Sequence, residues 1–89
     1  MMEQSQAWSR ELIGGQVQAR VQELLGPDEA FDWQEDLAVH GLDSMATMNL
    51  IIEFEGLFNV AFEDEELLFE NFSTIEKMVN RIFAKRVPA

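Results

Sequence analysis

One serine in this chain stands where a hydroxyl group can do chemistry at the start of a helix. It is Ser44, and it lies in the run Gly41-Leu42-Asp43-Ser44-Met45, directly before an apolar stretch that reaches Phe58. A serine at a helix start is commonly the N-cap, whose side-chain oxygen accepts from the first backbone N–H groups. Asp43 can take that role. The Ser44 hydroxyl is then free at the positive end of the helix dipole, where an anionic group is favoured.

The other reactive side chains are not arranged as a catalytic centre. His40 precedes Ser44 by four residues, but no G-x-S-x-G turn is present, so we interpret His40 as an exposed loop residue. Glu53 and Glu55 are two positions apart on a predicted helix and do not face each other. The acidic run 63–66 lacks the glycine and alternating ligands of an EF-hand loop. We therefore predict no catalytic residue, no metal site and no enzymatic activity.

The first element that must position Ser44 is a helix from about Gln6 to Leu25, capped by Ser5 or Ser9. Its apolar residues recur at helical spacing and are expected on one buried face: Trp8, Leu12, Ile13, Val17, Val21, Leu24 and Leu25. The pair Gly14-Gly15 is expected to weaken the helix, and Gly26-Pro27 ends it. A long loop from Asp28 to Asp43 follows, fastened to the helices by Phe31, Trp33, Leu37, Val39 and Leu42.

Three more helices complete the predicted fold. The second runs from Ser44 to about Leu57, with Asn59 as its C-cap, and buries Leu50, Ile51, Phe54 and Phe58. A short third helix extends from Glu63 to about Asn71. The fourth begins with a capping box at Ser73 and Glu76 and carries an apolar stripe: Ile75, Met78, Val79, Ile82 and Phe83. We predict an all-α four-helix bundle with a short third helix and a long first loop, forming a single domain over residues 1–89 with an ordered core of about 6–85.

The five-residue run and its flanking helices resemble the modification site of acyl and peptidyl carrier proteins, over roughly Gln6 to Phe83. The resemblance implies that a phosphopantetheinyl transferase, using Mg²⁺, esterifies Ser44 with 4′-phosphopantetheine from coenzyme A. It also implies that Asp43 contacts the metal ion during this transfer. The chain has no cysteine, so the thiol that carries acyl or aminoacyl groups as thioesters must come from the arm.

The resemblance also makes the second helix the docking face for partner enzymes. We assign docking to Met45, Ala46, Met48, Asn49 and Ile52, although a methionine stripe at helical spacing is also typical of core. Carriers of fatty-acid synthesis have acids just after the serine, and none lies between Ser44 and Ile52 here. The segment Met45-Ala46-Thr47-Met48 is more similar to D-alanyl carriers, or to the stand-alone carriers of polyketide and nonribosomal peptide assembly lines. Asp43 replaces the histidine that is common in peptidyl carriers.

Charge and length narrow the partners. The 89 residues carry a net charge of −11, and no lysine or arginine lies between Val21 and Glu76, where 15 of the 17 acids are found. We expect negative potential throughout that span, repulsion of nucleic acid and anionic lipid, and attraction of basic proteins. No secretory signal or membrane-length apolar stretch is visible, which favours a cytoplasmic monomer. An unmodified acidic helical adaptor for a basic partner is the alternative from another class.

Overall fold

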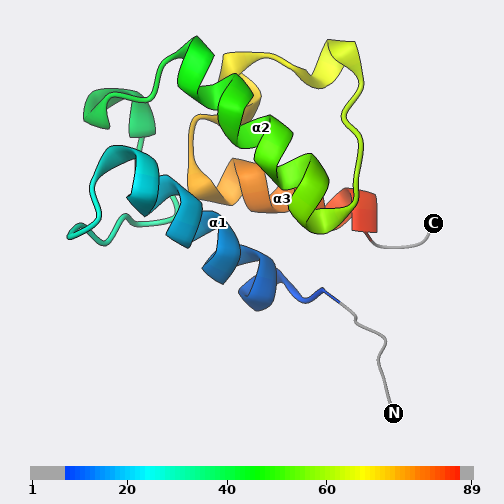
Figure 1. The fold of residues 1–89 in the computed structure, drawn as a ribbon, viewed down its shortest axis with the longest axis horizontal. Helices are drawn as coiled ribbons and strands as arrows, with labels where there is room; N and C mark the ends of the chain where they lie inside the picture. Colours follow the sequence, from blue (N-terminus) through cyan, green and yellow to red (C-terminus); the bar gives the residue numbers. More distant parts are fainter. Residues whose placement is uncertain (1–7, 87–89) are drawn as a thin grey trace.

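The computed structural model describes residues 8–86 as an all-α fold, which confirms the predicted class (Figure 1). In chain order the elements are α1 (Arg10–Leu25), η1 (Leu37–His40), α2 (Ser44–Phe58), η2 (Asp64–Glu66), η3 (Phe69–Phe72) and α3 (Ile75–Arg86). Those labelled η are 3₁₀ helices, and residues 8–86 contain no strand. None of the helices in this range is long and apolar enough to cross a membrane.

The predicted third helix is not an α-helix. The two 3₁₀ turns η2 and η3 take its place, so the described range holds three α-helices. Leu68 between them has extended dihedral angles (φ −105°, ψ 137°) and interrupts the helical turns. This break allows Phe72 to be fully buried, with its ring edge-on to Phe62 at 5.5 Å between centroids.

The three α-helices pack on one another around a single apolar core. On α2 the four residues predicted to be buried are buried, and Asn59 ends the helix in the left-handed conformation at φ 55°, as predicted. The core consists of Ile13, Val17, Val21, Phe31, Leu37, Leu42, Leu50, Ile51, Phe54, Phe58, Phe62, Phe72, Ile75, Met78, Val79 and Ile82.

Helix α1 differs from its prediction at both its start and its buried face. It begins at Arg10, because Ser9 is the N-cap and its Oγ accepts from the Leu12 N–H at 3.1 Å. Gln6, the predicted start, lies outside the described residues. Leu12 and Leu24 were expected in the core, but their exposed fractions are 57% and 43%. The buried stripe of α1 is therefore narrower than the sequence pattern suggests.

Gly14 has a packing role that its helix propensity does not reveal. It is buried, and a Cβ atom at this position would lie 2.2 Å from Cζ2 of Trp33. The indole ring therefore lies directly on the helix backbone, with the Arg10 guanidinium 5.5 Å from its centroid. The absence of a side chain at Gly14 is what lets the long loop pack against α1. Gly15, in contrast, has nothing within 4 Å of an added Cβ.

The long loop is fastened at both predicted and unpredicted points. Phe31, Leu37 and Leu42 are buried, Trp33 is half-buried, and Val39 is exposed, contrary to expectation. Two backbone hydrogen bonds tie the loop to the start of α3: Leu37 N–H donates to the Ser73 carbonyl, and Glu76 N–H donates to the Trp33 carbonyl, both at 2.9 Å.

The capping box predicted at Ser73 and Glu76 does not form. Thr74 caps α3 instead, since its Oγ1 accepts from the Lys77 N–H at 3.1 Å. An N-cap residue needs extended dihedral angles, whereas Ser73 is in the right-handed helical region (φ −81°, ψ −9°) as the C-cap of η3.

Candidate functional site

Asp43 is the N-cap of α2, as predicted. Its dihedral angles are extended (φ −115°, ψ −175°), and its Oδ1 accepts from the Ala46 N–H at 2.8 Å. The Asp43 carbonyl accepts from the Thr47 N–H at 2.9 Å. Ser44 is the first residue of α2 and is exposed. Its hydroxyl is consequently not needed to cap the helix.

Thr47 also fixes this helix start, and the sequence analysis did not identify it. It is the one polar side chain buried among the described residues, and its Oγ1 donates to the Asp43 carbonyl at 2.7 Å. Such a bond from a threonine hydroxyl to the carbonyl four residues earlier is a common local pattern. The signal was therefore present in the spacing of Asp43 and Thr47.

The segment that leads into Ser44 has a fixed geometry. Gly41 has φ 103°, in the left-handed region that strongly favours glycine. Its N–H donates to the Ala38 carbonyl, and the Leu42 N–H donates to the Leu37 carbonyl, each at 3.1 Å. The Leu42 side chain is buried in the core. The glycine makes the turn and the leucine anchors it, so the motif presents Ser44 at a defined position.

His40 is more constrained than predicted. It is half-buried, its Nε2 lies 2.5 Å from Glu35 Oε2, and its ring is edge-on to Phe31 at 5.0 Å between centroids. The interpretation as a freely exposed histidine was therefore wrong, because the sequence did not reveal that the loop folds Glu35 back onto it. The Asp32 backbone N–H and the His40 ring together hold the pKa of Glu35 below its usual range. No hydrogen bond links His40 to Ser44 among the described side chains.

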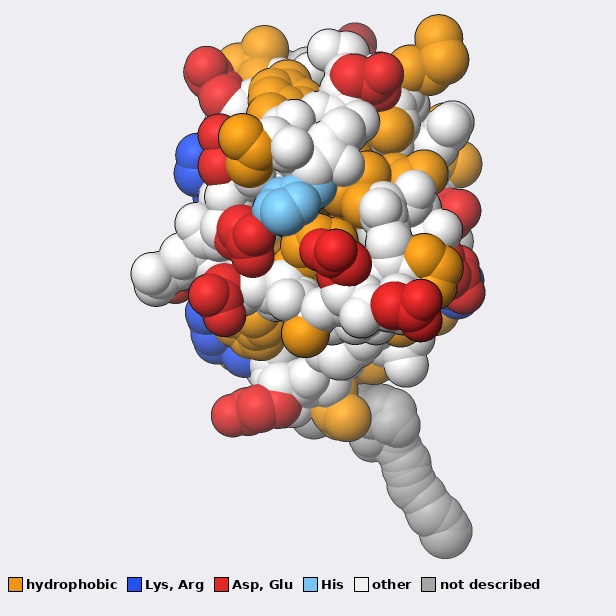
Figure 2. Space-filling view, turned by 90° about the vertical axis from the view of Figure 1, so that its left-hand side faces the viewer, with side chains coloured by type: hydrophobic (Ala, Val, Ile, Leu, Met, Phe, Trp, Pro, Cys, Tyr) orange, Lys and Arg blue, Asp and Glu red, His pale blue; other side chains and the backbone are white. Residues whose placement is uncertain are grey.

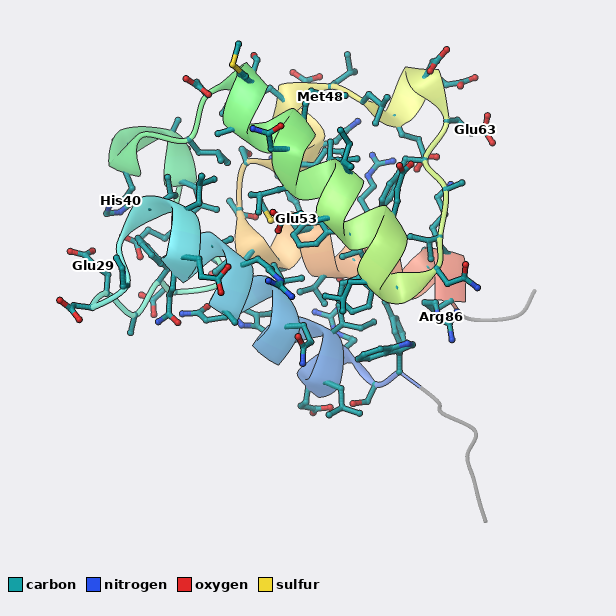
Figure 3. The ribbon with its side chains drawn as sticks, viewed as in Figure 1. Glu29, His40, Met48, Glu53, Glu63 and Arg86 are labelled. Carbon is teal, nitrogen blue, oxygen red and sulfur yellow. The ribbon has the colours of Figure 1, made fainter. Side chains whose placement is uncertain are left out.

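The outer face of α2 next to Ser44 is apolar and exposed (Figure 3). The exposed fractions are 76% for Met45, 40% for Met48 and 60% for Ile52, so these three are not core residues. Asn49 is exposed between them, while Ala46 is half-buried against the core. Their spacing of three and four places them on one face of the helix. The structure thus brings four of the five predicted docking residues together on an accessible surface.

A small pocket of about 70 Å³ adjoins Ser44 where α2 meets the η2–η3 segment. It is lined by Ser44, Thr47, Met48, Ile51, Leu67, Leu68 and Phe69. Because a cavity needs only about 10–15 Å³ of such volume to hold one water molecule, the pocket has room for several small groups. Above it, the first backbone N–H groups of α2 lack intrahelical acceptors, which suits a phosphate ester on Ser44 followed by a branched apolar segment.

The charge around the site is negative, but less uniformly than the sequence suggests. Figure 2 shows acidic side chains across the face that carries His40, with cations only at its margins. At Glu66, however, the fold supplies cations that the sequence analysis did not place beside the acids of this span. Lys85 Nζ lies 2.5 Å and Arg81 Nη1 3.5 Å from the Glu66 carboxylate, because α3 returns alongside η2. Burial raises the pKa of Glu66, but bonds from Lys85 and the Glu63 N–H, with the charges of Lys85 and Arg81, hold it below its usual value.

The fold and this site are those of a small helical carrier domain, in which a helix start offers a hydroxyl for covalent modification. The family described as "Phosphopantetheine attachment site" matches residues 15–82 of the chain. The chain therefore belongs to this family of carrier proteins, which hold 4′-phosphopantetheine covalently.

Two relatives with established names are similar over most of the chain. A D-alanyl carrier protein of Streptococcus suis is 36% identical over 63 residues, covering 70% of this chain and 80% of the relative. An acyl carrier protein of Thermotoga maritima is 34% identical over 79 residues, covering 86% of this chain and 95% of the relative. No solved structure gives a significant match.

Proposed function

We propose that the chain is a carrier modified with 4′-phosphopantetheine on Ser44. The observation that carries this proposal is that Asp43 makes the capping hydrogen bond at the start of α2, whereas the exposed Ser44 hydroxyl makes none. In the transfer, Ser44 Oγ forms a bond to the phosphorus of the coenzyme A arm and the phosphoanhydride bond breaks. Adenosine 3′,5′-bisphosphate leaves, and the hydroxyl proton passes to the transferase. Asp43 assists through the Mg²⁺ ion of that encounter.

The arm supplies the thiol that this cysteine-free chain lacks, and it carries acyl or aminoacyl groups as thioesters. Met45, Met48, Asn49 and Ile52 form the docking face, and Ala46 supports it from the core side. The partners are a phosphopantetheinyl transferase, a loading enzyme and downstream synthases. Because the arm holds the cargo next to this face, the substrate reaches each partner at high effective concentration.

The small pocket bears on the cargo. The pocket beside Ser44 is small, at about 70 Å³. The core beneath is filled by Phe54, Phe58 and Phe72, which are fully buried. We infer a short or polar cargo, which favours a polyketide, nonribosomal peptide or other specialised pathway. A D-alanyl carrier is the second candidate, favoured by the relative from Streptococcus suis and by the acid-free first turns of α2.

We further propose that residues 1–89 form one carrier domain that acts as a cytoplasmic monomer, without catalysis of its own. The alternative from another class, an unmodified acidic adaptor, makes a different prediction. It leaves Ser44 unmodified even when a competent transferase is present.

Intact-mass spectrometry tests the proposal. The wild type, Ser44→Ala and the control Ser73→Ala are incubated with coenzyme A, Mg²⁺ and a transferase of broad specificity. We expect a single phosphopantetheine increment on the wild type and on Ser73→Ala, and none on Ser44→Ala. Continued modification of Ser44→Ala, or none on the wild type, refutes the assignment. A second measurement tests the cargo. If the fold does not bury a long acyl chain, protein carrying an acetyl arm and protein carrying an octanoyl arm should have equal melting temperatures. A buried octanoyl chain would instead stabilise the fold by about 0.8 kcal/mol per methylene.

A further inference from the structure

Leu24 on α1 is a further exposed apolar residue close to the docking face. Leu24 was expected in the core, yet it is 43% exposed and lines a groove of about 220 Å³ between α1 and α2. The remaining residues of the groove are Arg20, Glu23, Asn49, Leu50 and Glu53. Asn49 precedes Leu50 and follows Met48 on α2, so the groove is continuous with the proposed docking face. Leu24 on α1, together with the exposed Met48 and Ile52 on α2, is called the apolar strip below.

The residues that line the groove are suited to bind one long cationic side chain of a partner protein. Leu24 and Leu50 provide apolar walls, and the carboxylates of Glu23 and Glu53 come from opposite helices. Figure 3 places Glu53 on the side of α2 that faces α1. Arginine and lysine combine an apolar stem with a charged head, and this groove offers surface for both.

Arg20 of the chain itself already lies in this groove. Its Nη1 is 3.4 Å from Glu23 Oε1, in a pair whose side chains are 36% and 69% exposed. Exposed pairs of this kind contribute little to stability, about 0–1 kcal/mol. A partner cation can therefore displace Arg20 from Glu23 easily. Arg20 is the one cationic residue that lines the groove, so its charge opposes the attraction of a basic partner to Glu23 and Glu53.

We infer that the transferase which modifies Ser44 inserts an arginine or lysine side chain into the groove between α1 and α2, while its apolar residues cover the strip. This inference rests on the proposed function and extends the docking surface to α1. Glu53 lies nine residues after Ser44, which is about 13 Å along the helix. The inserted side chain of the transferase thus fixes the orientation of the transferase at a distance from Ser44. Arg20 weakens the attraction between that side chain and the carboxylates of the groove.

The test measures kcat/KM for loading of Ser44 from coenzyme A by a broad-specificity transferase, with intact mass confirming the site. Glu53→Gln and Leu24→Gln should each lower kcat/KM by about two- to fivefold, the range of one exposed charge or contact. Arg20→Gln should raise it by about the same factor. The matched controls are Glu29→Gln, an exposed acid outside the groove, and Leu12→Gln, an exposed leucine of α1 outside the groove. Both should load within experimental error of the wild type.

The outcomes separate this inference from the proposed function. If Glu53→Gln and Leu24→Gln load like their controls, or if Arg20→Gln loads more slowly, the groove takes no part and the inference is overturned while the carrier function stands. If no variant loads, the wild type included, the proposed function fails and this inference fails with it. Circular dichroism and melting temperature of each variant show that a change in loading does not come from unfolding.

Discussion

Asp43 and Ser44 are adjacent, but the structure indicates that only Asp43 contributes to the stability of the fold. Asp43 Oδ1 accepts the Ala46 N–H at 2.8 Å, and its charge lies at the positive end of α2. Losing an N-cap costs about 1 kcal/mol, and losing the favourable charge about 0.5 kcal/mol more. Asp43→Ala should therefore destabilise the fold by about 1.5 kcal/mol. At about 4–8 °C per kcal/mol for a domain of this size, the melting temperature falls by about 6–12 °C.

Ser44→Ala removes a hydroxyl that makes no hydrogen bond in the described structure. We expect a change within about 0.5 kcal/mol, as for other exposed positions, and a complete loss of loading. Asp43→Asn separates the cap from the charge. The asparagine oxygen still accepts from the Ala46 N–H, so the melting temperature should remain close to that of the wild type. Loading should nevertheless slow, since the carboxylate no longer assists the metal ion of the transferase.

Two measurements on purified apo protein check these expectations: thermal unfolding followed by circular dichroism, and the rate of phosphopantetheine transfer by intact mass. A destabilised Ser44→Ala would mean that Ser44, not Asp43, caps α2. Loading of Asp43→Asn at the rate of the wild type would refute the role assigned to the carboxylate. A stable Asp43→Ala would show that the hydrogen bond to Ala46 contributes little.

Three further predictions concern packing, docking and pH. Gly14→Ala should destabilise the fold by about 1–3 kcal/mol because its Cβ meets Trp33 at 2.2 Å, whereas the neighbouring Gly15→Ala should stabilise it by up to about 1 kcal/mol; chemical denaturation measures both. Met48→Glu should leave the melting temperature nearly unchanged, since Met48 is 40% exposed, but should slow loading. The pKa of Glu66 is lowered in the folded state, so its carboxylate stabilises the fold at neutral pH. This stabilisation is lost as pH falls below 4.5, the usual pKa of a glutamate. The difference in melting temperature between the wild type and Glu66→Gln should therefore vanish in acid.

The start of α2 could be predicted from sequence because its determinants are local. The N-cap and the core spacing of α2 act within a few residues, and the structure bears them out at Asp43 and Phe54. The class of the fold and the family followed from the same local features. The docking residues and the attachment of the arm to Ser44 remain predictions.

The features that the sequence did not predict depend on contacts between distant segments. Gly14 is needed because Trp33, nineteen residues later, packs on it. Thr74 replaces Ser73 as the cap of α3 because Ser73 is the C-cap of the preceding 3₁₀ turn and has helical dihedral angles. Leu24 satisfies the helical pattern of core positions, but α1 and α2 leave a groove there in place of a packed interface. Periodicity identifies one face of a helix, and it does not reveal where a neighbouring helix diverges.

The charge distribution shows the same limit and bears on function. In sequence no cation lies between Val21 and Glu76, but in space α3 brings Lys85 and Arg81 to the Glu66 carboxylate. These two cations are therefore engaged at η2. Within residues 8–86, Glu53 has no ion pair of this kind. Its negative charge therefore remains available on the face that carries the apolar residues, which is the combination that a partner with basic and apolar side chains can recognise.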